Sequence, residues 1–134
     1  MTAYLLDTNI IAGIFHKEAS IESALHQAFD TESTLYLSAV VYYETKRGLL
    51  KRDARKQMEA LERLVDQFKW VDFLKDDWEE AARLWAERNR KGMPIADADL
   101  LIAVQAKRLG TILVTDNEWD FTGLGLQIEN WRKA

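Results

Sequence analysis

The stretch Ala3-Tyr4-Leu5-Leu6-Asp7-Thr8-Asn9-Ile10-Ile11 decides how this chain folds. Its apolar run ends in an acid and two small polar residues, after which apolar residues resume at helical spacing. This pattern predicts a buried strand that delivers Asp7 to a strand-to-helix turn. Open α/β sheets hold their ligands beyond the carboxyl ends of such strands. Because a carboxylate there is partly desolvated, it needs a cation, a metal ion or hydrogen-bond donors to stay ionised.

Strand-like and helix-like segments alternate along the rest of the chain. Short apolar or alternating runs predict four further strands, at Thr34–Ser38, Trp70–Phe73, Thr111–Val114 and, at the sheet edge, Leu126–Trp131. Amphipathic spacing predicts a helix over residues 55–68, and the run from Leu100 to Ala106 predicts a largely buried one. The chain is therefore expected to form a single α/β domain over residues 1–134. We expect a central, mainly parallel sheet of four to five strands between two layers of helices.

Composition narrows the kinds of site that are expected. The 134 residues include no cysteine and only two histidines, His16 and His26, so any metal ion would be held by oxygen, which favours magnesium or manganese. The absence of cysteine also fits a cytoplasmic protein. No apolar run approaches the roughly 20 residues that span a bilayer, and no signal peptide is expected. A formal net charge of −4 argues against a protein that binds nucleic acid through bulk positive charge.

Acidic residues follow strands or open helices at four places in the sequence. These residues are Asp7, Glu44, Asp99 and the pair Asp116 and Asp120. Because the carboxyl ends of parallel strands meet at one sheet edge, these acids can converge although they lie far apart in sequence. Clustered carboxylates repel one another unless a multivalent cation lies among them. The pattern therefore predicts a site for Mg²⁺ or Mn²⁺, where a water molecule can attack a phosphodiester.

The two acids at the start of the buried helix are expected to differ in role. Asp97 and Asp99 lie roughly 200° apart on a helix of 3.6 residues per turn, so only one faces the site. We predict that Asp97 is the N-cap and that Asp99 faces the other acids. The alternative is that both merely cap the helix and stabilise its dipole.

A basic segment follows the second predicted strand. Lys46, Arg47, Lys51 and Arg52 could contact backbone phosphates beside an acidic cleft, which would reconcile a negative protein with a polyanionic substrate. The alternative for this segment is a solvated helix face.

At these residues the chain resembles the PIN-domain proteins of the VapC toxin family. The similarity spans nearly the whole chain and is ordered as in that family: Leu5-Leu6-Asp7-Thr8-Asn9-Ile10, then Leu37-Ser38 with Glu44 and Gly48, then Asp99-Leu100-Leu101-Ile102-Ala103 with Ala106 and Gly110, then Leu113-Val114-Thr115-Asp116-Asn117 with Asp120-Phe121.

The resemblance implies a PIN-like fold and a Mg²⁺-dependent endoribonuclease, the toxin of a type II toxin–antitoxin system. It implies a VapB-like antitoxin partner, a homodimer, and cleavage that leaves a 5′-phosphate and a 3′-hydroxyl. Carried over by position, Asp7 and Asp99 are metal ligands and Glu44 is the third acid. Asp116, Asn117 and Asp120 compete for the fourth place, of which Asp120 is favoured and Asp116 comes next. Thr8, Asn9 and Asn117 support the turns.

Other functions are also compatible with a small α/β protein. A phospho-acceptor signalling domain needs an aspartate beyond a middle strand, whereas Asp72 lies inside the predicted one. A phosphohydrolase with an aspartyl nucleophile usually carries a second acid two residues later, where this chain has Asn9. The stronger alternative is a non-catalytic PIN domain that binds RNA or protein. The presence of Asp7, Glu44 and Asp99 together weighs against it, because buried charges without a function are costly.

Overall fold

The computed structural model describes residues 2–133. In chain order the elements are β1 (Ala3–Leu6), α1 (Thr8–Phe15), α2 (Ala19–Asp30), β2 (Thr34–Ser38), α3 (Ala39–Arg52), α4 (Arg55–Gln67), β3 (Lys69–Val71), α5 (Lys75–Arg90), α6 (Asp97–Leu109), β4 (Ile112–Val114), the short 3-10 helix η1 (Glu118–Phe121) and β5 (Gln127–Glu129). The predicted α/β class is confirmed.

The strands form one five-stranded sheet in the order β3-β2-β1-β4-β5, and every neighbouring pair is parallel. β1 lies at the centre, where Leu5 and Leu6 are fully buried. The chain passes from β1 to β2 on one side and later returns to β4 on the other. The carboxyl ends of β1 and β4 therefore form a topological switch point, the place where open α/β sheets bind ligands.

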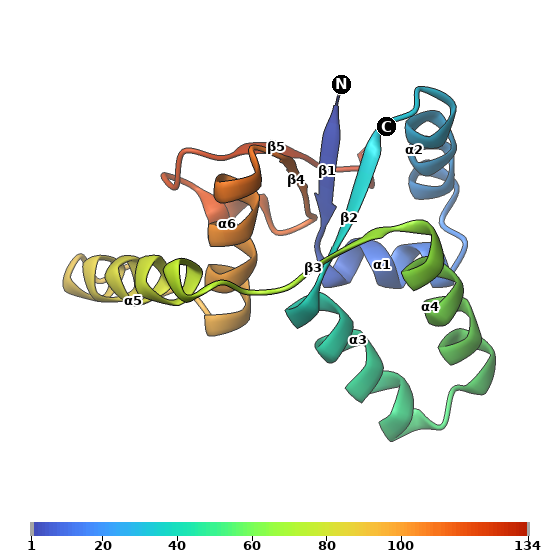
Figure 1. The fold of residues 1–134 in the computed structure, drawn as a ribbon, viewed down its shortest axis with the longest axis horizontal. Coiled ribbons are helices and arrows are strands. Elements are labelled where there is room, and N and C mark those ends of the chain that lie inside the picture. Colours follow the sequence, from blue (N-terminus) through green and yellow to red (C-terminus); the bar gives the residue numbers. More distant parts are fainter. Residues whose placement is uncertain (1, 134) are drawn as a thin grey trace.

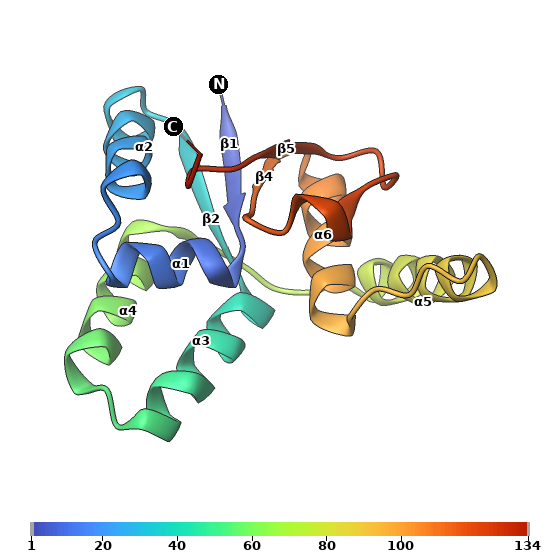
Figure 2. The ribbon, with the colours of Figure 1, turned by 180° about the vertical axis from the view of Figure 1, so that it is seen from behind.

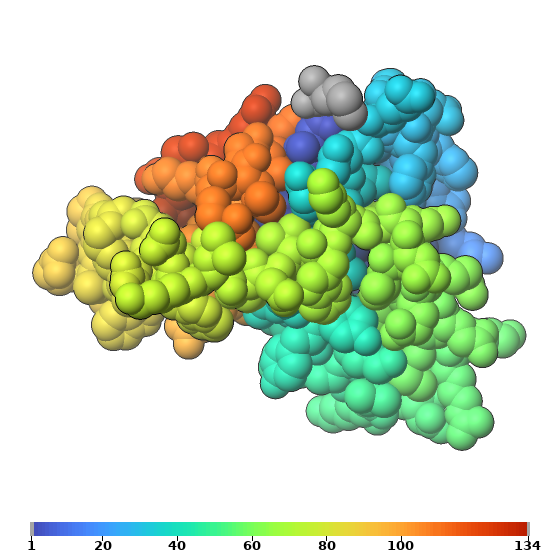
Figure 3. Space-filling model, in the orientation of Figure 1, coloured from blue at the N-terminus to red at the C-terminus, as the bar shows by residue number. Residues whose placement is uncertain are grey.

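The helices lie on both sides of the central strands. Figure 1 shows α1 and α2 on one side of β1 and β2, and α5 and α6 on the other; Figure 2 shows the same arrangement from behind. α3 and α4 project together from the end of the sheet where β2 ends (Figure 1). In the space-filling view, the yellow-green atoms of β3 and the start of α5 cross the face that is turned to the reader (Figure 3).

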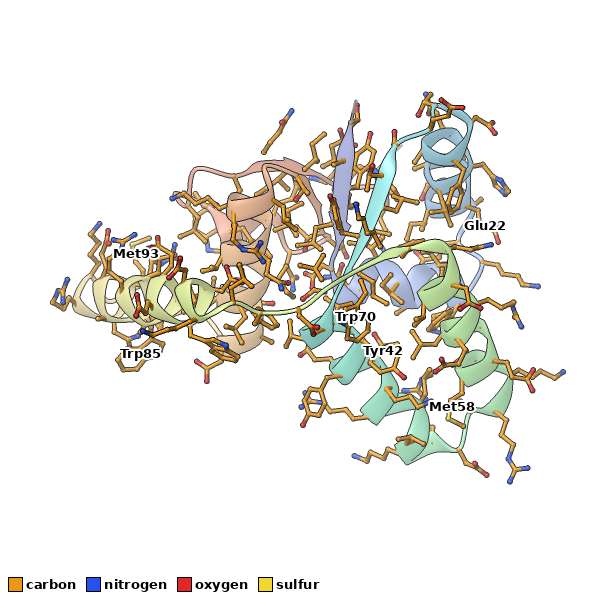
Figure 4. All side chains as sticks on the ribbon, viewed as in Figure 1. Glu22, Tyr42, Met58, Trp70, Trp85 and Met93 are labelled. Carbon is orange, nitrogen blue, oxygen red and sulfur yellow. The ribbon has the colours of Figure 1, made fainter. Side chains whose placement is uncertain are left out.

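Aromatic contacts attach the projecting helix α3 to the sheet edge. The rings of Tyr42 on α3 and Trp70 on β3 meet edge to face, with centroids 5.2 Å apart (Figure 4). The Tyr42 hydroxyl also donates to Glu62 on α4, at 3.1 Å. Edge-to-face pairs add roughly 0.5–1.5 kcal/mol to the burial of the rings. These contacts hold the start of α3, which carries Glu44, against β3.

α6 is the buried helix that the sequence predicts, and six of its residues from Leu100 to Ala106 are buried. Its Gln105 amide donates to the carbonyl oxygens of Asp72 and Val71, at 3.2 and 3.4 Å. The chain leaves the sheet at Val71, where these bonds lie, and β3 therefore ends before Asp72, inside the strand predicted over Trp70–Phe73. The prediction that Asp97 caps α6 is wrong: Ala96 is the N-cap and Asp97 is the first helical residue.

An ion pair between the buried Asp77 and the partly exposed Arg108 joins α5 to α6. The Arg108 guanidinium donates to both carboxylate oxygens of Asp77, with N–O distances of 2.7 and 3.0 Å. Asp77 is only 1 % exposed and also accepts the backbone N–H of Leu74, at 2.9 Å. Two-pronged pairs of this kind fix orientation as well as distance. The pair therefore sets the position of α6, the helix that carries Asp99.

Within residues 2–133, no helix has both the length and the apolar character needed to cross a membrane.

Candidate functional site

The candidate site begins at Asp7, directly after the central strand. The Asp7 backbone N–H donates to Val114 of β4, and its carbonyl oxygen accepts from Ile10 and Ile11 in the first turn of α1. Asp7 is therefore the last residue paired to the sheet and the N-cap of the helix. Its side chain is 3 % exposed. The local sequence places it there because the apolar strand ends at Leu6 and the helix begins at Thr8.

Hydrogen bonds from three residues fix the direction of the Asp7 carboxylate. The Thr8 backbone N–H donates to Oδ1, at 2.7 Å. The Thr115 hydroxyl donates to Oδ2 at 2.8 Å, and the Asn9 amide nitrogen lies 3.4 Å from the same oxygen. The Asn117 backbone N–H donates to Thr115 Oγ1, at 3.0 Å, which leaves the Thr115 proton free to point at Asp7.

Glu44 reaches the same edge from the second turn of α3. Its Oε1 accepts the Thr8 hydroxyl at 2.9 Å, so Thr8 contacts both Asp7 and Glu44. The capping residue Ser38 ends β2 and starts α3 without a loop, with its hydroxyl accepting the Val40 N–H at 3.3 Å. The direct passage from strand to helix brings a residue of the second helical turn close to the strand ends.

Asp99 and Asp120 complete a group of four acids with Asp7 and Glu44. Asp99 lies in the first turn of α6 and is half-buried, whereas its neighbour Asp97 is exposed. Burial raises the pKa of Asp99 to about 6, and the charges of Asp7, Asp120 and Glu44 add to the effect. Burial also raises the pKa of Asp7, against the opposing hydrogen bonds from Thr115 and Thr8. Four carboxylates from four separate segments thus repel one another here.

Asp116, the other acid after β4, takes a different position. Its Oδ2 accepts Arg132 Nη1 at 2.8 Å, and its Oδ1 accepts the Asn130 amide at 3.1 Å. The bonds from Arg132 and Asn130 lower the pKa of this carboxyl. Glu118 Oε2 accepts hydrogen bonds from Lys133 Nζ, at 2.6 Å, and from the Asn130 amide, at 3.3 Å. Between the two acids considered for the fourth position, Asp120 is the one whose charge acts on Asp7 and Asp99.

The predicted basic residues lie along α3 and are partly engaged with acids. Lys46 is 3.4 Å from Glu62, and Arg47 Nη2 is 3.8 Å from Glu44. The Arg47 guanidinium also lies over the Tyr43 ring, 5.0 Å from its centroid. Lys51 and Arg52 are exposed in the last turn of the helix. Arg47 is thus the predicted cation that borders the acid group.

Two contributors to the site were missed by sequence reasoning. Thr115 donates to Asp7, and its position directly after an apolar strand was the available signal. Arg132 contacts Asn9 and Asp116 from more than a hundred residues beyond Asn9, and nothing in the local sequence indicates this.

The acid group has the chemistry of a divalent-cation site with oxygen ligands. Among residues 2–133, no three carboxylate or imidazole groups are placed to hold a metal ion by themselves. Mg²⁺ is usually bound through one or two carboxylates, with water and phosphate oxygens as its other ligands. The buried Asp7 and half-buried Asp99, whose charges repel, fit that requirement.

We expect the metal-free protein to gain stability when Asp99 is replaced by asparagine. The folded pKa of about 6 exceeds the ordinary 3.8, so the stability linked to Asp99 is complete below about pH 4 and is lost as the pH rises through 6. Because the side chain is half-exposed and solvent screens it, Asp99→Asn should raise the free energy of unfolding by only about 1 kcal/mol above pH 7. Urea unfolding in EDTA at several pH values measures this.

The control for this experiment is Asp97→Asn, two residues earlier on the same helix. Asp97 is exposed in the first turn, so its replacement should leave stability unchanged or lower it slightly. A gain from Asp99→Asn that persists unchanged at about pH 4 would contradict the electrostatic explanation.

Comparison with known proteins gives consistent results. The PIN domain family matches residues 4–123. The chain is 30 % identical to the tRNA(fMet)-specific endonuclease VapC of Shigella flexneri, covering 98 % of this chain and 99 % of that protein. It is 29 % identical to ribonuclease VapC2 of Rickettsia felis, covering 97 % and 98 %.

Solved structures share the fold over the same length. The structure of VapBC2 from Rickettsia felis bound to a DNA fragment from its promoter contains a chain that matches with a TM-score of 0.86 and 28 % identity, over 97 % of this chain and 99 % of that one. A chain of VapBC-1 from nontypeable Haemophilus influenzae matches with a TM-score of 0.85 and 25 % identity, over 98 % and 100 %.

Proposed function

Since the chain is a PIN-domain protein of the VapC family, we propose that it is a metal-dependent endoribonuclease and the toxin of a toxin–antitoxin pair. The observation that carries the proposal is the group of four acids at the switch point of the sheet, with the buried Asp7 at its centre. The activities for which the relatives from Shigella flexneri and Rickettsia felis are named support an RNA substrate.

Asp7 and Asp99 are the residues that would hold the cation. Three groups fix the Asp7 carboxylate, which therefore keeps its direction before a ligand arrives. Asp99 is placed by the rigid helix α6, whose buried face fixes its rotation. A divalent cation held by this pair would polarise an attacking water molecule and neutralise charge on the phosphodiester. Preorganised ligands avoid the cost of reorientation during the reaction.

Glu44 and Asp120 have different roles beside this pair. The Thr8 hydroxyl occupies Glu44 Oε1, and the remaining lone pairs of Glu44 are available to accept a hydrogen bond from the water that attacks phosphorus. Asp120 adds negative charge beside Asp7 and Asp99, which strengthens the attraction of the site for a cation. Because Thr8 donates to both Asp7 and Glu44, it fixes the position of these two carboxylates relative to each other.

The basic residues of α3 would bind the phosphate backbone next to the acids. Arg47 lies 3.8 Å from Glu44, which is a weak contact. A phosphate group of the RNA can therefore replace Glu44 as the partner of the Arg47 guanidinium. Lys51 and Arg52 extend positive charge along the same helix. Such contacts set where RNA lies, and they carry no sequence preference themselves.

We further propose that the chain acts in the cytoplasm with a VapB-like antitoxin protein as its partner. The matching chains from Rickettsia felis and Haemophilus influenzae belong to VapBC complexes, the former bound to promoter DNA. The agreement of these chains with this one over nearly their full length supports a partner of the same kind.

Removal of the metal ion tests the proposal. Purified protein, free of antitoxin, is incubated with total cellular RNA in Mg²⁺ or Mn²⁺, and the products are resolved on denaturing gels. We expect discrete cleavage with either ion and none in EDTA, because the paired carboxylates alone cannot activate water. Adding back Mn²⁺ in excess over EDTA should restore cutting, which separates metal loss from unfolding.

The folded state of each sample is checked by circular dichroism. A folded, antitoxin-free protein that leaves RNA uncut with either ion would overturn the ribonuclease proposal and favour a non-catalytic binding module. Cleavage that continues unchanged in EDTA would overturn the metal-dependent mechanism.

A further inference from the structure

Arg132 lies outside the group of acids but joins the segments that surround it. Its guanidinium donates Nε and Nη2 to the two carboxylate oxygens of Glu18, at 3.0 and 2.9 Å. Nη1 donates to Asp116 Oδ2 at 2.8 Å, and Nη2 also donates to the Asn9 carbonyl oxygen at 3.1 Å. One planar group thus connects the first turn of α1, the connection before α2 and the loop after β4.

Arg132 is itself held firmly in place. The residue before it, Trp131, is 6 % exposed, and its ring packs edge to face against Tyr4 of β1, with centroids 5.3 Å apart. The Arg132 backbone N–H donates to Asn130 Oδ1 at 3.0 Å, and the Asn130 amide binds Asp116 Oδ1. Both oxygens of Asp116 are therefore occupied by a network that starts at the segment after β5.

This network determines which way the Asn9 side chain points. The Asp116 backbone N–H donates to Asn9 Oδ1, at 3.1 Å. With its oxygen committed to that donor, the Asn9 nitrogen faces Asp7 Oδ2, at 3.4 Å. A flipped amide would set its oxygen against the Asp7 carboxylate and its protons against the Asp116 N–H, which loses both bonds. The loop that Arg132 holds thus orients the Asn9 amide so that its nitrogen donates to Asp7.

We propose that Arg132 is a positioning residue of the carboxylate site: by holding Asp116 and the first turn of α1, it fixes the Asn9 amide and through it the Asp7 carboxylate. This inference rests on the proposed function for its effect on catalysis. It gives Asp116 a supporting place in the site, distinct from the four acids that repel one another. Partners that orient metal ligands typically change metal affinity 10–100-fold when they are replaced.

The first readout does not depend on metal or RNA. In metal-free protein, Arg132→Gln should shift the side-chain amide resonances of Asn9 in ¹H–¹⁵N spectra, because the loop that binds its oxygen is released. The matched control is Lys133→Gln, which removes the adjacent cation and its bond to Glu118 but none of the contacts to Asn9. We expect the control to leave the Asn9 resonances in place. Asn9 resonances that stay unchanged in Arg132→Gln would overturn the proposal.

The second readout is Mn²⁺ affinity, measured by titration calorimetry without RNA. Arg132→Gln should weaken binding about 10-fold, whereas Lys133→Gln should change it less than about twofold. Asp116→Asn should act in the same direction, and the double variant should be no weaker than the worse single variant, because both act through one path. Independent, additive losses in this cycle would contradict the proposed path.

Kinetics separate a positioning role from a general loss of stability. Assayed well below the melting temperature, Arg132→Gln should lower kcat about 10-fold and leave KM for RNA unchanged. A lower melting temperature with unaltered affinity and kcat would mean that Arg132 is only structural. If wild-type protein binds Mn²⁺ but cuts no RNA, the ribonuclease proposal fails while the amide and affinity results still decide the role of Arg132.

Discussion

A protein carrying both Asp7→Asn and Asp99→Asn is expected to cut RNA at less than about 1 % of the wild-type rate, a larger loss than replacement of a supporting residue gives. Both changes keep the side-chain volume and remove the negative charge. In the wild-type protein, hydrogen bonds from Thr8 and Thr115 fix the Asp7 carboxylate. Asparagine has nearly the same shape, so the main property that the variant loses is the negative charge that would bind the cation. Initial rates on a fluorescent RNA, at saturating Mn²⁺, measure the loss.

The matched control is a protein with Asp97→Asn and Asp116→Asn, which removes the same number of charges from nearby positions. Asp97 is exposed and Asp116 pairs with Arg132, so this variant should retain roughly 10 % or more of the activity. The Asp7 and Asp99 variant should remain folded, because it removes charges that repel one another. The control should also remain folded, because Asp97 and Asp116 are exposed and Asp116 takes part only in a surface ion pair. Equal losses in the two proteins would contradict the assignment of Asp7 and Asp99 as the reactive pair.

The largest effect on stability is expected from Arg108→Met. It leaves the Asp77 carboxylate, 1 % exposed, with only the Leu74 N–H as a partner. Removing one member of a fully buried ion pair costs about 3–5 kcal/mol, because the other charge stays desolvated. Since the Arg108 side chain is 31 % exposed, we expect a loss near the lower end of that range. That is a large fraction of the roughly 5–15 kcal/mol that stabilise a typical domain. Urea unfolding with fluorescence detection measures the change.

Two variants identify the cause of that loss. Lys107→Met removes an exposed cation from the same turn of α6 and should change stability by less than about 0.5 kcal/mol. Adding Asp77→Asn to Arg108→Met should recover part of the loss, because the buried group is then neutral and can still accept the Leu74 N–H. A double variant no more stable than Arg108→Met would mean that packing, and not the unpaired charge, explains the effect.

Much of the fold was predictable from local pattern. The strand ending at Leu6, the turn at Asp7 and the buried helix before Gly110 follow from apolar periodicity and from the residues that break it. The end of β3 could not be predicted locally, because the carbonyl oxygens of Val71 and Asp72 bind Gln105, more than thirty residues later in the chain. The cap of α6 was predicted wrongly because an acid near a helix start can serve the dipole without being the N-cap.

The sequence by itself determined which residue types could carry the chemistry and that Asp7, Glu44 and Asp99 would reach one sheet edge, since parallel strands fix that edge. Only the tertiary structure showed how the surroundings of Asp116 and Asp120 differ. Asp116 lies between β4 and η1 and pairs with Arg132 from a distant part of the chain, whereas Asp120 lies in η1 and its charge acts on Asp7 and Asp99. Hydrogen bonds between segments far apart in sequence depend on the packed fold, so no local pattern contains them.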